Sequence, residues 1–223
     1  MSDIRRPLLI LLVAFLLSLT ACGPRQNADG RWSEKDASQI IQRYYLAQNP
    51  GLNPKTRFTV EEITTEETWQ KLKIQVFRIS EDIYANETFI LNGEILVQMG
   101  TAFGGSGVTD MLVTSLYRPD AHELVFIYNF GSGIHRTNIA AYLPWYDASR
   151  TLECDTSYLG DLELARGEDG GVTVQIIEPD DQQSDPVTLG SLAITKESSL
   201  LFLDLEINPS LPTDYLEGIS VFK

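Results

Sequence analysis

Two glycine-rich segments, residues 103–107 and 131–136, carry the side chains best suited to binding a ligand. The candidate binding residues in them are Gly104, Gly105, Gly107, Ser132, His135 and Arg136. Glycine removes side-chain bulk, so a partner can approach the backbone and use its N–H groups. Arg136 adds a planar, permanently charged fork that fits an anionic group. We expect both segments at one end of a sheet, with His135 and Arg136 on its rim.

Ser132 and His135 also raise the question of nucleophilic catalysis, in which a histidine takes the proton of an attacking serine. The glycine–x–serine–x–glycine elbow that exposes such a serine is missing, because Phe130 occupies its first glycine position. Glycine on both sides of Ser132 is typical of a tight turn or bulge. The sequence therefore predicts no catalytic residue, and an enzyme is the less favoured class.

Metal ligands are sparse. The chain contains two histidines, His122 and His135, and two cysteines, with no cluster at zinc-ligand spacing. The acidic stretch 178–186 has the composition of a solvated surface loop. We predict no metal site and no cofactor.

The N-terminus carries a different chemistry. Arg5 and Arg6 precede the apolar run 8–17, which is too short for a helix spanning a bilayer of about 30 Å but suits a signal peptide. The residues Leu19-Thr20-Ala21-Cys22 follow, and they resemble the bacterial lipobox. This resemblance implies that diacylglycerol alkylates the Cys22 thiol, that residues 1–21 are removed, and that an acyl chain such as palmitate is added to the new amine. Two or three acyl chains hold a protein firmly on a bilayer, whereas one holds it marginally.

The lipobox resemblance also implies an organisation and a location. Residues 1–21 form the signal peptide, 22–32 a tether and 33–223 a single β-rich domain. The mature protein would lie outside the cytoplasm, anchored through Cys22 to the cell membrane or the outer membrane. Cys154 would then have no partner in the chain, and we expect a small buried residue there, not a reactive thiol.

The charge balance narrows the range of partners. The chain has 17 basic and 31 acidic residues and a net charge of −14. Without residues 1–21, which contain Asp3, Arg5 and Arg6, 15 basic and 30 acidic residues remain, a net charge of −15. Such a surface repels nucleic acid, because nucleic-acid binding depends on neutralising phosphates with Lys and Arg.

Hydrophobic periodicity predicts a mainly β fold. One helix is expected at 34–47, capped by Ser33 with Asp36 three residues later. Asn92-Gly93 is a strong signal for a type I′ hairpin, and 196–199 for a second turn. Strands are expected at 69–79, 88–91, 94–97, 111–116, 123–130, 134–143, 158–165, 172–177, 189–195 and 200–207. This pattern favours an antiparallel sandwich, barrel or propeller-like sheet with one N-terminal helix.

Residues 103–126 resemble an FG-GAP or VCBS-type repeat, the blade unit of certain β-propellers. In this resemblance 111–116 matches the strand before the calcium loop, and 123–126 the strand after it. The family's ligand positions hold Ser115, Tyr117 and Pro119 in this chain. Calcium needs six to eight oxygen ligands, several of them carboxylates, so the resemblance implies a blade unit that has lost its metal.

Taken with the anchor, these features favour a membrane-anchored lipoprotein of the bacterial envelope. Its β-domain would have a non-enzymatic binding or structural role, with another envelope component as partner. Two alternatives stay open: a hydrolase of envelope polymers that uses a pair of carboxylates, and a calcium-free FG-GAP-like adhesion module. Trp145 and Tyr146 either stack on a ligand or plug the end of the sheet.

Overall fold

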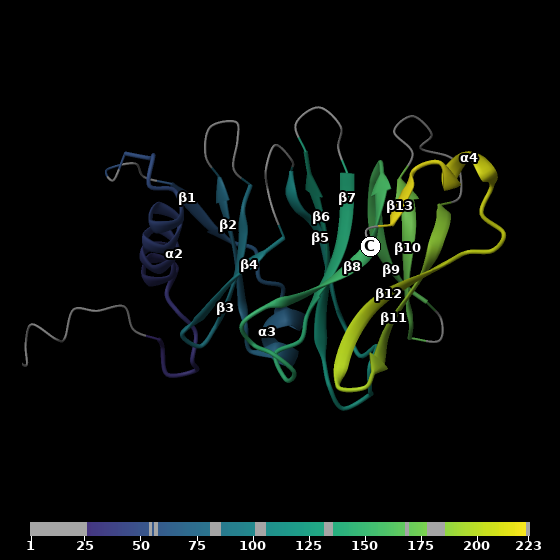
Figure 1. The fold of residues 1–223 in the computed structure, drawn as a ribbon. Helices are drawn as coiled ribbons and strands as arrows, with labels where there is room; N and C mark the ends of the chain where they lie inside the picture. Colours follow the sequence, from purple (N-terminus) through teal and green to yellow (C-terminus); the bar gives the residue numbers. More distant parts are fainter. Residues whose placement is uncertain are drawn as a thin grey trace, which may run out of the picture.

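Two β-sheets and a long N-terminal helix form the molecule (Figure 1). The structure, a computed structural model, describes residues 26–53, 55, 58–80, 86–100, 106–131, 136–167, 170–177 and 186–221. One sheet is antiparallel, with strand order β1-β2-β3-β4, and the other has the order β5-β6-β7-β8-β12-β11-β10-β9, with β13 paired to β8. The predicted mainly β class with one N-terminal helix is confirmed.

The elements have the following bounds. The helices are α2 (Glu34–Gln48), α3 (Glu66–Leu72) and α4 (Thr213–Leu216). The strands of the four-stranded sheet are β1 (Thr59–Glu62), β2 (Gln75–Ser80), β3 (Thr88–Asn92) and β4 (Ile95–Met99). The strands of the larger sheet are β5 (Gly107–Thr114), β6 (Glu123–Phe130), β7 (Arg136–Tyr142), β8 (Thr151–Leu159), β9 (Asp161–Arg166), β10 (Val172–Ile177), β11 (Val187–Glu197), β12 (Leu200–Ile207) and β13 (Ile219–Val221).

Helix α2 begins where the sequence predicts. The Ser33 hydroxyl accepts a hydrogen bond from the Asp36 backbone N–H at 3.2 Å and donates one to the Asp36 carboxylate at 2.8 Å. These bonds satisfy an otherwise unpaired N–H of the first turn. Ile41 and Tyr45 are buried on the face of α2 that packs against the four-stranded sheet, in a cluster with Phe77.

The predicted strand at 69–79 is wrong over its first half, which forms helix α3. Thr65 caps that helix by accepting a hydrogen bond from the Thr68 N–H at 3.1 Å, and Lys71 pairs with Glu67 at 2.9 Å. Lys73 ends it in the left-handed conformation, at φ 55°. These local capping and charge interactions outweigh the short apolar alternation that suggested a strand.

The hairpin between β3 and β4 is confirmed, with its turn one residue later than expected. Asn92 pairs with Ile95, so the central residues are Gly93 and Glu94. Gly93 has a φ of 58°, whereas Glu94 has no positive φ. A glycine at the first central position is the pattern of a type II′ turn, not the predicted type I′.

Most other strand predictions are close to the structure. The bounds of β6, β10 and β12 are confirmed, as is the turn between β11 and β12. The predicted strand at 158–165 is divided at Gly160, where the φ of 139° separates β8 from β9. Strand β8 starts at Thr151, in a stretch where the sequence analysis expected none.

The larger sheet curls into a nearly closed barrel whose interior is apolar. Val125 and Ile127 of β6 point into this interior, which they share with the far wall of β10, β11 and β12. Leu124 and Phe126 of the same strand point the other way and pack against the four-stranded sheet. The order of layers is therefore α2, the four-stranded sheet, the β5–β7 wall, the barrel interior and the far wall (Figure 1).

Side chains bridge the two ends of the curled sheet, β5 and β9. The Asp110 carboxylate on β5 accepts hydrogen bonds from the Leu164 N–H of β9 at 2.7 Å and from the Met111 N–H at 2.8 Å. Arg166 on β9 donates to the Val113 carbonyl at 2.9 Å and pairs with Glu67 of α3 at 2.9 Å. The barrel is thus closed at this seam by side-chain contacts.

We expect Asp110→Ala to lower the free energy of unfolding by about 2–4 kcal/mol, because it removes two hydrogen bonds to a charged group and leaves the Leu164 N–H without its partner. Urea unfolding followed by circular dichroism measures the change. Glu61→Ala, at an exposed position on β1, is the control and should stay within about 0.5 kcal/mol of the parent. Equal stability of the Asp110 variant and the parent would contradict a role for this carboxylate in closing the barrel.

Candidate functional site

The predicted binding residues fall partly outside the described chain. Gly104, Gly105, Ser132 and His135 lie outside the described residues, whereas Gly107 and Arg136 lie within them. Gly107 starts β5 and pairs with Asn129 of β6, and Arg136 starts β7 and pairs with Phe130. The strand ends next to the two glycine-rich segments therefore lie at the same end of the larger sheet.

Gly107 has a packing role. Its φ is 69°, and a Cβ at this position would lie 2.0 Å from the Asn86 carbonyl oxygen. Only glycine allows this close approach between the start of β5 and the residues that lead into β3. The glycine thus joins the two sheets at the end where Arg136 lies.

The Arg136 guanidinium is held by hydroxyl groups. Its Nη1 donates to Ser220 Oγ at 2.7 Å and lies 3.4 Å from Ser157 Oγ. The side chain is half-buried, and within the described part of the chain no carboxylate oxygen lies within 4.0 Å of its nitrogens. Its cross-strand neighbours on the same face are Phe130 and Leu159, and Leu159 is 49% exposed.

A second group of polar side chains lies on the same face, two residues further along the strands from the sheet end. Tyr128 donates to the Glu153 carboxylate at 2.8 Å and accepts from the Asn138 amide at 3.0 Å. Burial and the neighbouring Glu153 carboxylate raise the pKa of Tyr128 well above its usual range, so the phenol stays protonated. Asn138 Oδ1 is buried and has no hydrogen-bond partner among the described residues. This group gives the face fixed dipoles next to the Arg136 charge.

A pocket of about 630 Å³ lies at the same end of the sheet, at the seam between β5 and β9. Its lining residues are Ser106, Thr109, Asp110, Asn129, Asp161, Leu162, Glu163, Leu164 and Ile177. Three carboxylates and no basic side chain line it, so it repels anions. Asp110 already accepts two backbone N–H groups, and Asp161 accepts from the Asn129 amide at 3.3 Å. Arg136, which can attract an anion at this sheet end, lies outside this pocket.

The loop between β5 and β6, which resembles a calcium loop, is tied by side chains. Glu123 is fully buried and accepts hydrogen bonds from the Leu116 N–H and, at 2.8 Å, from the Thr114 hydroxyl. Ser115 Oγ lies 2.7 Å from His122 Nδ1, within hydrogen-bonding distance. Among the described residues no three His, Cys, Asp or Glu side chains are arranged to hold a metal ion.

Trp145 covers the end of the barrel where the loop between β5 and β6 lies, opposite the Arg136 end. Its ring stacks on Tyr117, with the centroids 5.3 Å apart and the planes at 17°, and the Arg118 guanidinium lies 5.2 Å from its centroid. Both rings, with Tyr146, pack against the barrel core. Of the two roles open for Trp145 and Tyr146, the structure favours the plug.

The serines that hold Arg136 were missed from the sequence. Ser157 lies on β8 and Ser220 on β13. The sequence analysis predicted no strand that includes either serine. The alternation of Leu152, Cys154 and Tyr158 was the available signal for β8. Cys154 is buried there, and burial raises its pKa, as expected for an unreactive thiol.

Comparison of the chain with models of protein families, with curated proteins and with solved structures finds no match. The resemblances to the lipobox and to an FG-GAP unit therefore stay predictions from the sequence. Within the part of the chain that the structure describes, no helix is both long and apolar enough to cross a membrane.

Glu123 gives the stability a pH dependence. Burial raises its pKa in the folded state, more than the hydrogen bonds from Leu116 and Thr114 lower it. As the pH rises above about 4.3, the unfolded chain loses this proton first, so the folded state binds more protons. Glu123 therefore lowers the free energy of unfolding progressively with rising pH, until its folded-state pKa is passed.

We expect Glu123→Gln, which stays neutral at every pH, to gain stability relative to the parent as the pH rises from about 4.5 to about 7.5, because it has no proton to lose on unfolding. Urea unfolding at the two pH values measures this difference. Glu61→Gln, at an exposed position on β1, should show no such trend. A stability difference between Glu123→Gln and the parent that does not change with pH would contradict a raised pKa of Glu123 in the folded protein.

Proposed function

We propose that this chain is a membrane-anchored lipoprotein of the bacterial envelope, whose β-domain binds another envelope component through an anionic group at Arg136. The observation that carries the binding proposal is the state of the Arg136 guanidinium. It is half-buried and oriented by Ser157 and Ser220, and no described carboxylate neutralises it. The molecule around it is strongly acidic.

Partial burial without a counter-charge costs desolvation free energy, which hydroxyl groups only partly offset. A bound carboxylate or phosphate would supply the missing charge and form charge-assisted hydrogen bonds with the guanidinium. The flanking side chains of Phe130 and Leu159 are apolar. They lower the local polarity and suit a ligand that has an apolar part next to its anionic group.

The hydrolase alternative has less support. Glu87 and Glu123 are the described acidic side chains whose pKa burial raises. Asn86, next to Glu87, contacts Gly107 at the Asn129 end of β6, whereas Glu123 starts that strand. At about 3.4 Å per residue along β6, Glu87 and Glu123 are on the order of 20 Å apart. Paired carboxylates of glycosidases lie about 5–10 Å apart.

The adhesion-module alternative rests on the FG-GAP resemblance. Strands β5 and β6 do form an antiparallel pair around the loop, as the resemblance implies. That arrangement is common to most hairpins, and no observation among the described residues favours adhesion over binding at Arg136. We therefore keep the envelope binding domain as the proposed function.

Lipidation of Cys22 is tested by substitution in a bacterial host. We expect Cys22→Ala to abolish incorporation of labelled palmitate and to move the protein out of the membrane fraction, because two or three acyl chains supply the attachment. Cys154→Ala is a matched control, since it removes the other cysteine and should leave labelling and attachment intact. Full membrane attachment of the Cys22 variant would refute the anchor.

Anion binding at Arg136 is tested with inorganic phosphate on the full-length lipoprotein in detergent, at constant ionic strength. Phosphate at about ten times its Kd should add about 1.4 kcal/mol to the stability and raise the Tm. Arg136→Gln should lose this shift, and Arg136→Lys should keep only part of it, because lysine lacks the planar fork. Arg150→Gln changes an exposed arginine paired with Asp147 and should respond like the parent. Absence of a shift in the parent, or an equal shift in Arg136→Gln, would disprove the site.

A further inference from the structure

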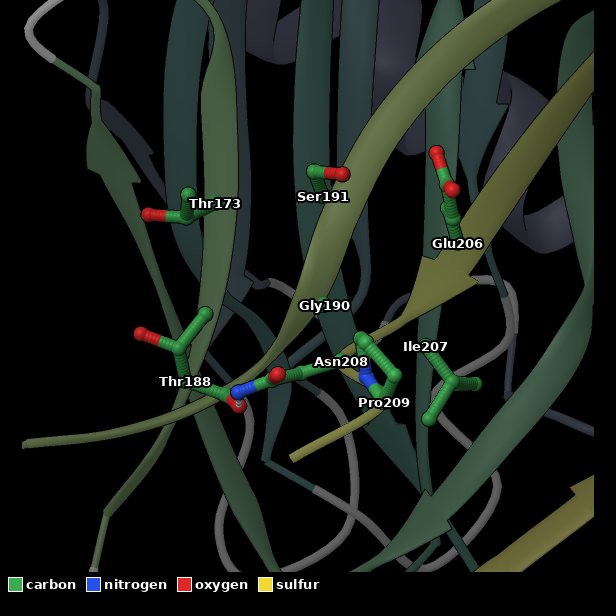
Figure 2. A pocket seen from close by; sticks show the side chains of 8 residues that line it. All are labelled: Thr173, Thr188, Gly190, Ser191, Glu206, Ile207, Asn208 and Pro209. Atoms are coloured by element: carbon green, nitrogen blue, oxygen red, sulfur yellow. Dashed lines mark hydrogen bonds between the residues drawn. The ribbon is translucent and has the colours of Figure 1, made fainter. Parts of the chain in front are cut away.

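A hollow of about 420 Å³ lies on the outer face of β10, β11 and β12, and Arg136 does not line it (Figure 2). Its lining residues are Thr173, Thr188, Gly190, Ser191, Glu206, Ile207, Asn208 and Pro209. Ser191 and Glu206 are exposed, whereas their chain neighbours Leu192 and Leu205 pack into the barrel core. The hollow therefore opens to the outside of the barrel.

A β-bulge creates the hollow. Val174 of β10 pairs with Gly190, but Gln175 pairs with Thr188, so β11 contains one extra residue at this point. Gly190 lines the hollow, and a Cβ there would lie 2.3 Å from the Glu206 carbonyl oxygen, so glycine allows β11 and β12 to approach closely at this point. A bulge redirects the side chains around it. Here the redirected side chains surround the backbone of Gly190, which has no side chain of its own.

One side of the hollow is rigid. The Asn208 amide donates to the Thr188 carbonyl at 3.1 Å, and its oxygen accepts from the Ser210 N–H at 3.0 Å. The Asn208 N–H donates to the Leu189 carbonyl at 2.9 Å. Preorganisation of this kind lowers the entropy that a ligand loses when it binds.

Three polar side chains that line the hollow have no hydrogen-bond partner among the described residues. Within the described part of the chain, the side chains of Thr188, Ser191 and Glu206 make no hydrogen bond or ion pair, and Thr173 makes one long contact, 3.4 Å to the Ala165 carbonyl. Figure 2 shows these oxygen-bearing side chains arranged around Gly190. Hydroxyls both donate and accept, and the carboxylate accepts, so the set matches a ligand rich in hydroxyl groups.

Other ligand classes fit less well. Glu206 would repel an anion, no basic side chain lines the hollow, and a single carboxylate is too few for a cation site. An added peptide strand needs an open sheet edge, but β11 is paired on both sides, with β10 and β12. Among the described residues that line the hollow, the large apolar side chains are Ile207, which also packs against the barrel core, and Pro209, so the hollow offers little apolar surface to an apolar ligand.

An exposed aromatic ring extends this surface. Phe202 is 40% exposed and lies on the same outer face of β12 as Glu206, four residues away. At about 3.4 Å per residue the two positions are about 14 Å apart. An aromatic face offers an apolar platform for the C–H face of a sugar ring. A ligand that reaches both Phe202 and the hollow is longer than one sugar unit.

We propose that the hollow at Gly190 binds a neutral saccharide, with Thr173, Thr188, Ser191 and Glu206 bonding one unit and Phe202 stacking on another unit of the same chain. This site is independent of Arg136, so either can fail without the other. Its ligand would be a neutral glycan chain, whose hydroxyls replace the water at the unoccupied side chains.

The test is calorimetric titration of the full-length lipoprotein in detergent. The probes are glucose, N-acetylglucosamine, maltotetraose, cellotetraose and the tetramer of N-acetylglucosamine. We expect at least one tetrasaccharide to bind with a Kd below 10 mM, a Glu206→Gln variant to bind it at least tenfold more weakly, and Ser191→Ala to weaken it as well. Glu197→Gln is the matched control, because this exposed glutamate lies on β11 outside the hollow.

Phe202→Ala separates a glycan chain from a single sugar. It should weaken the tetrasaccharide severalfold and leave the corresponding monosaccharide unchanged. Failure of every probe to bind the parent at 10 mM, or unchanged binding by Glu206→Gln, would overturn the proposal. Equal weakening by Glu197→Gln would also overturn it, because the effect would then reflect overall charge. Equal affinity for monosaccharide and tetrasaccharide would overturn the assignment of Phe202.

Discussion

Burial of β6 on both faces is the constraint on which the rest of the structure depends. Seven of its eight residues are buried, and alternate side chains serve two different cores. Val125 and Ile127 fill the barrel, whereas Leu124 and Phe126 fill the space under the four-stranded sheet. Because one strand is a wall of both cores, neither core is complete without it. The same strand fixes Phe130 beside Arg136, so the rigidity of the candidate site follows from this shared wall.

The sequence predicted elements well where the local pattern determines them. The strands β6, β10 and β12 have clear apolar patterns, and α2 has its own capping residues, so their limits were nearly correct. The strand predicted at 69–79 was wrong over its first half, where the prediction rested on few apolar positions. Gln75 of β2 is a polar residue buried at 2% exposure, where its amide exchanges two hydrogen bonds with the Trp32 backbone. Trp32 is 43 residues away along the chain, so the local sequence around Gln75 could not reveal this partner.

Partners that are distant in the sequence also limited the prediction of the candidate site. Arg136 stood out from its type and its glycine-rich surroundings, but Ser220 is 84 residues away along the chain. Four other arginines of the described chain lie beside carboxylates, Arg31 with Glu62, Arg118 with Asp120, Arg150 with Asp147 and Arg166 with Glu67, whereas Arg78 donates to the Val108 carbonyl at 2.8 Å. An acidic chain offers many such partners, so an arginine held only by hydroxyls is distinguished by its three-dimensional surroundings. Those surroundings depend on β8 and β13 pairing beside β7.

The N-terminal contacts give the proposed anchor a direction. Trp32 is held by Gln75 of β2 and donates its indole N–H to the Gly93 carbonyl at 2.7 Å, so the chain leaves the domain at the four-stranded sheet. Gln26 forms a bridge with Trp32, and Cys22 precedes it by only four residues, a reach of about 14 Å. A lipid on Cys22 would therefore hold the four-stranded sheet and α2 close to the bilayer. The wall of β10, β11 and β12 lies at the other end of the molecule (Figure 1), so such an anchor would leave the hollow on its outer face directed away from the membrane and accessible to the proposed glycan chain.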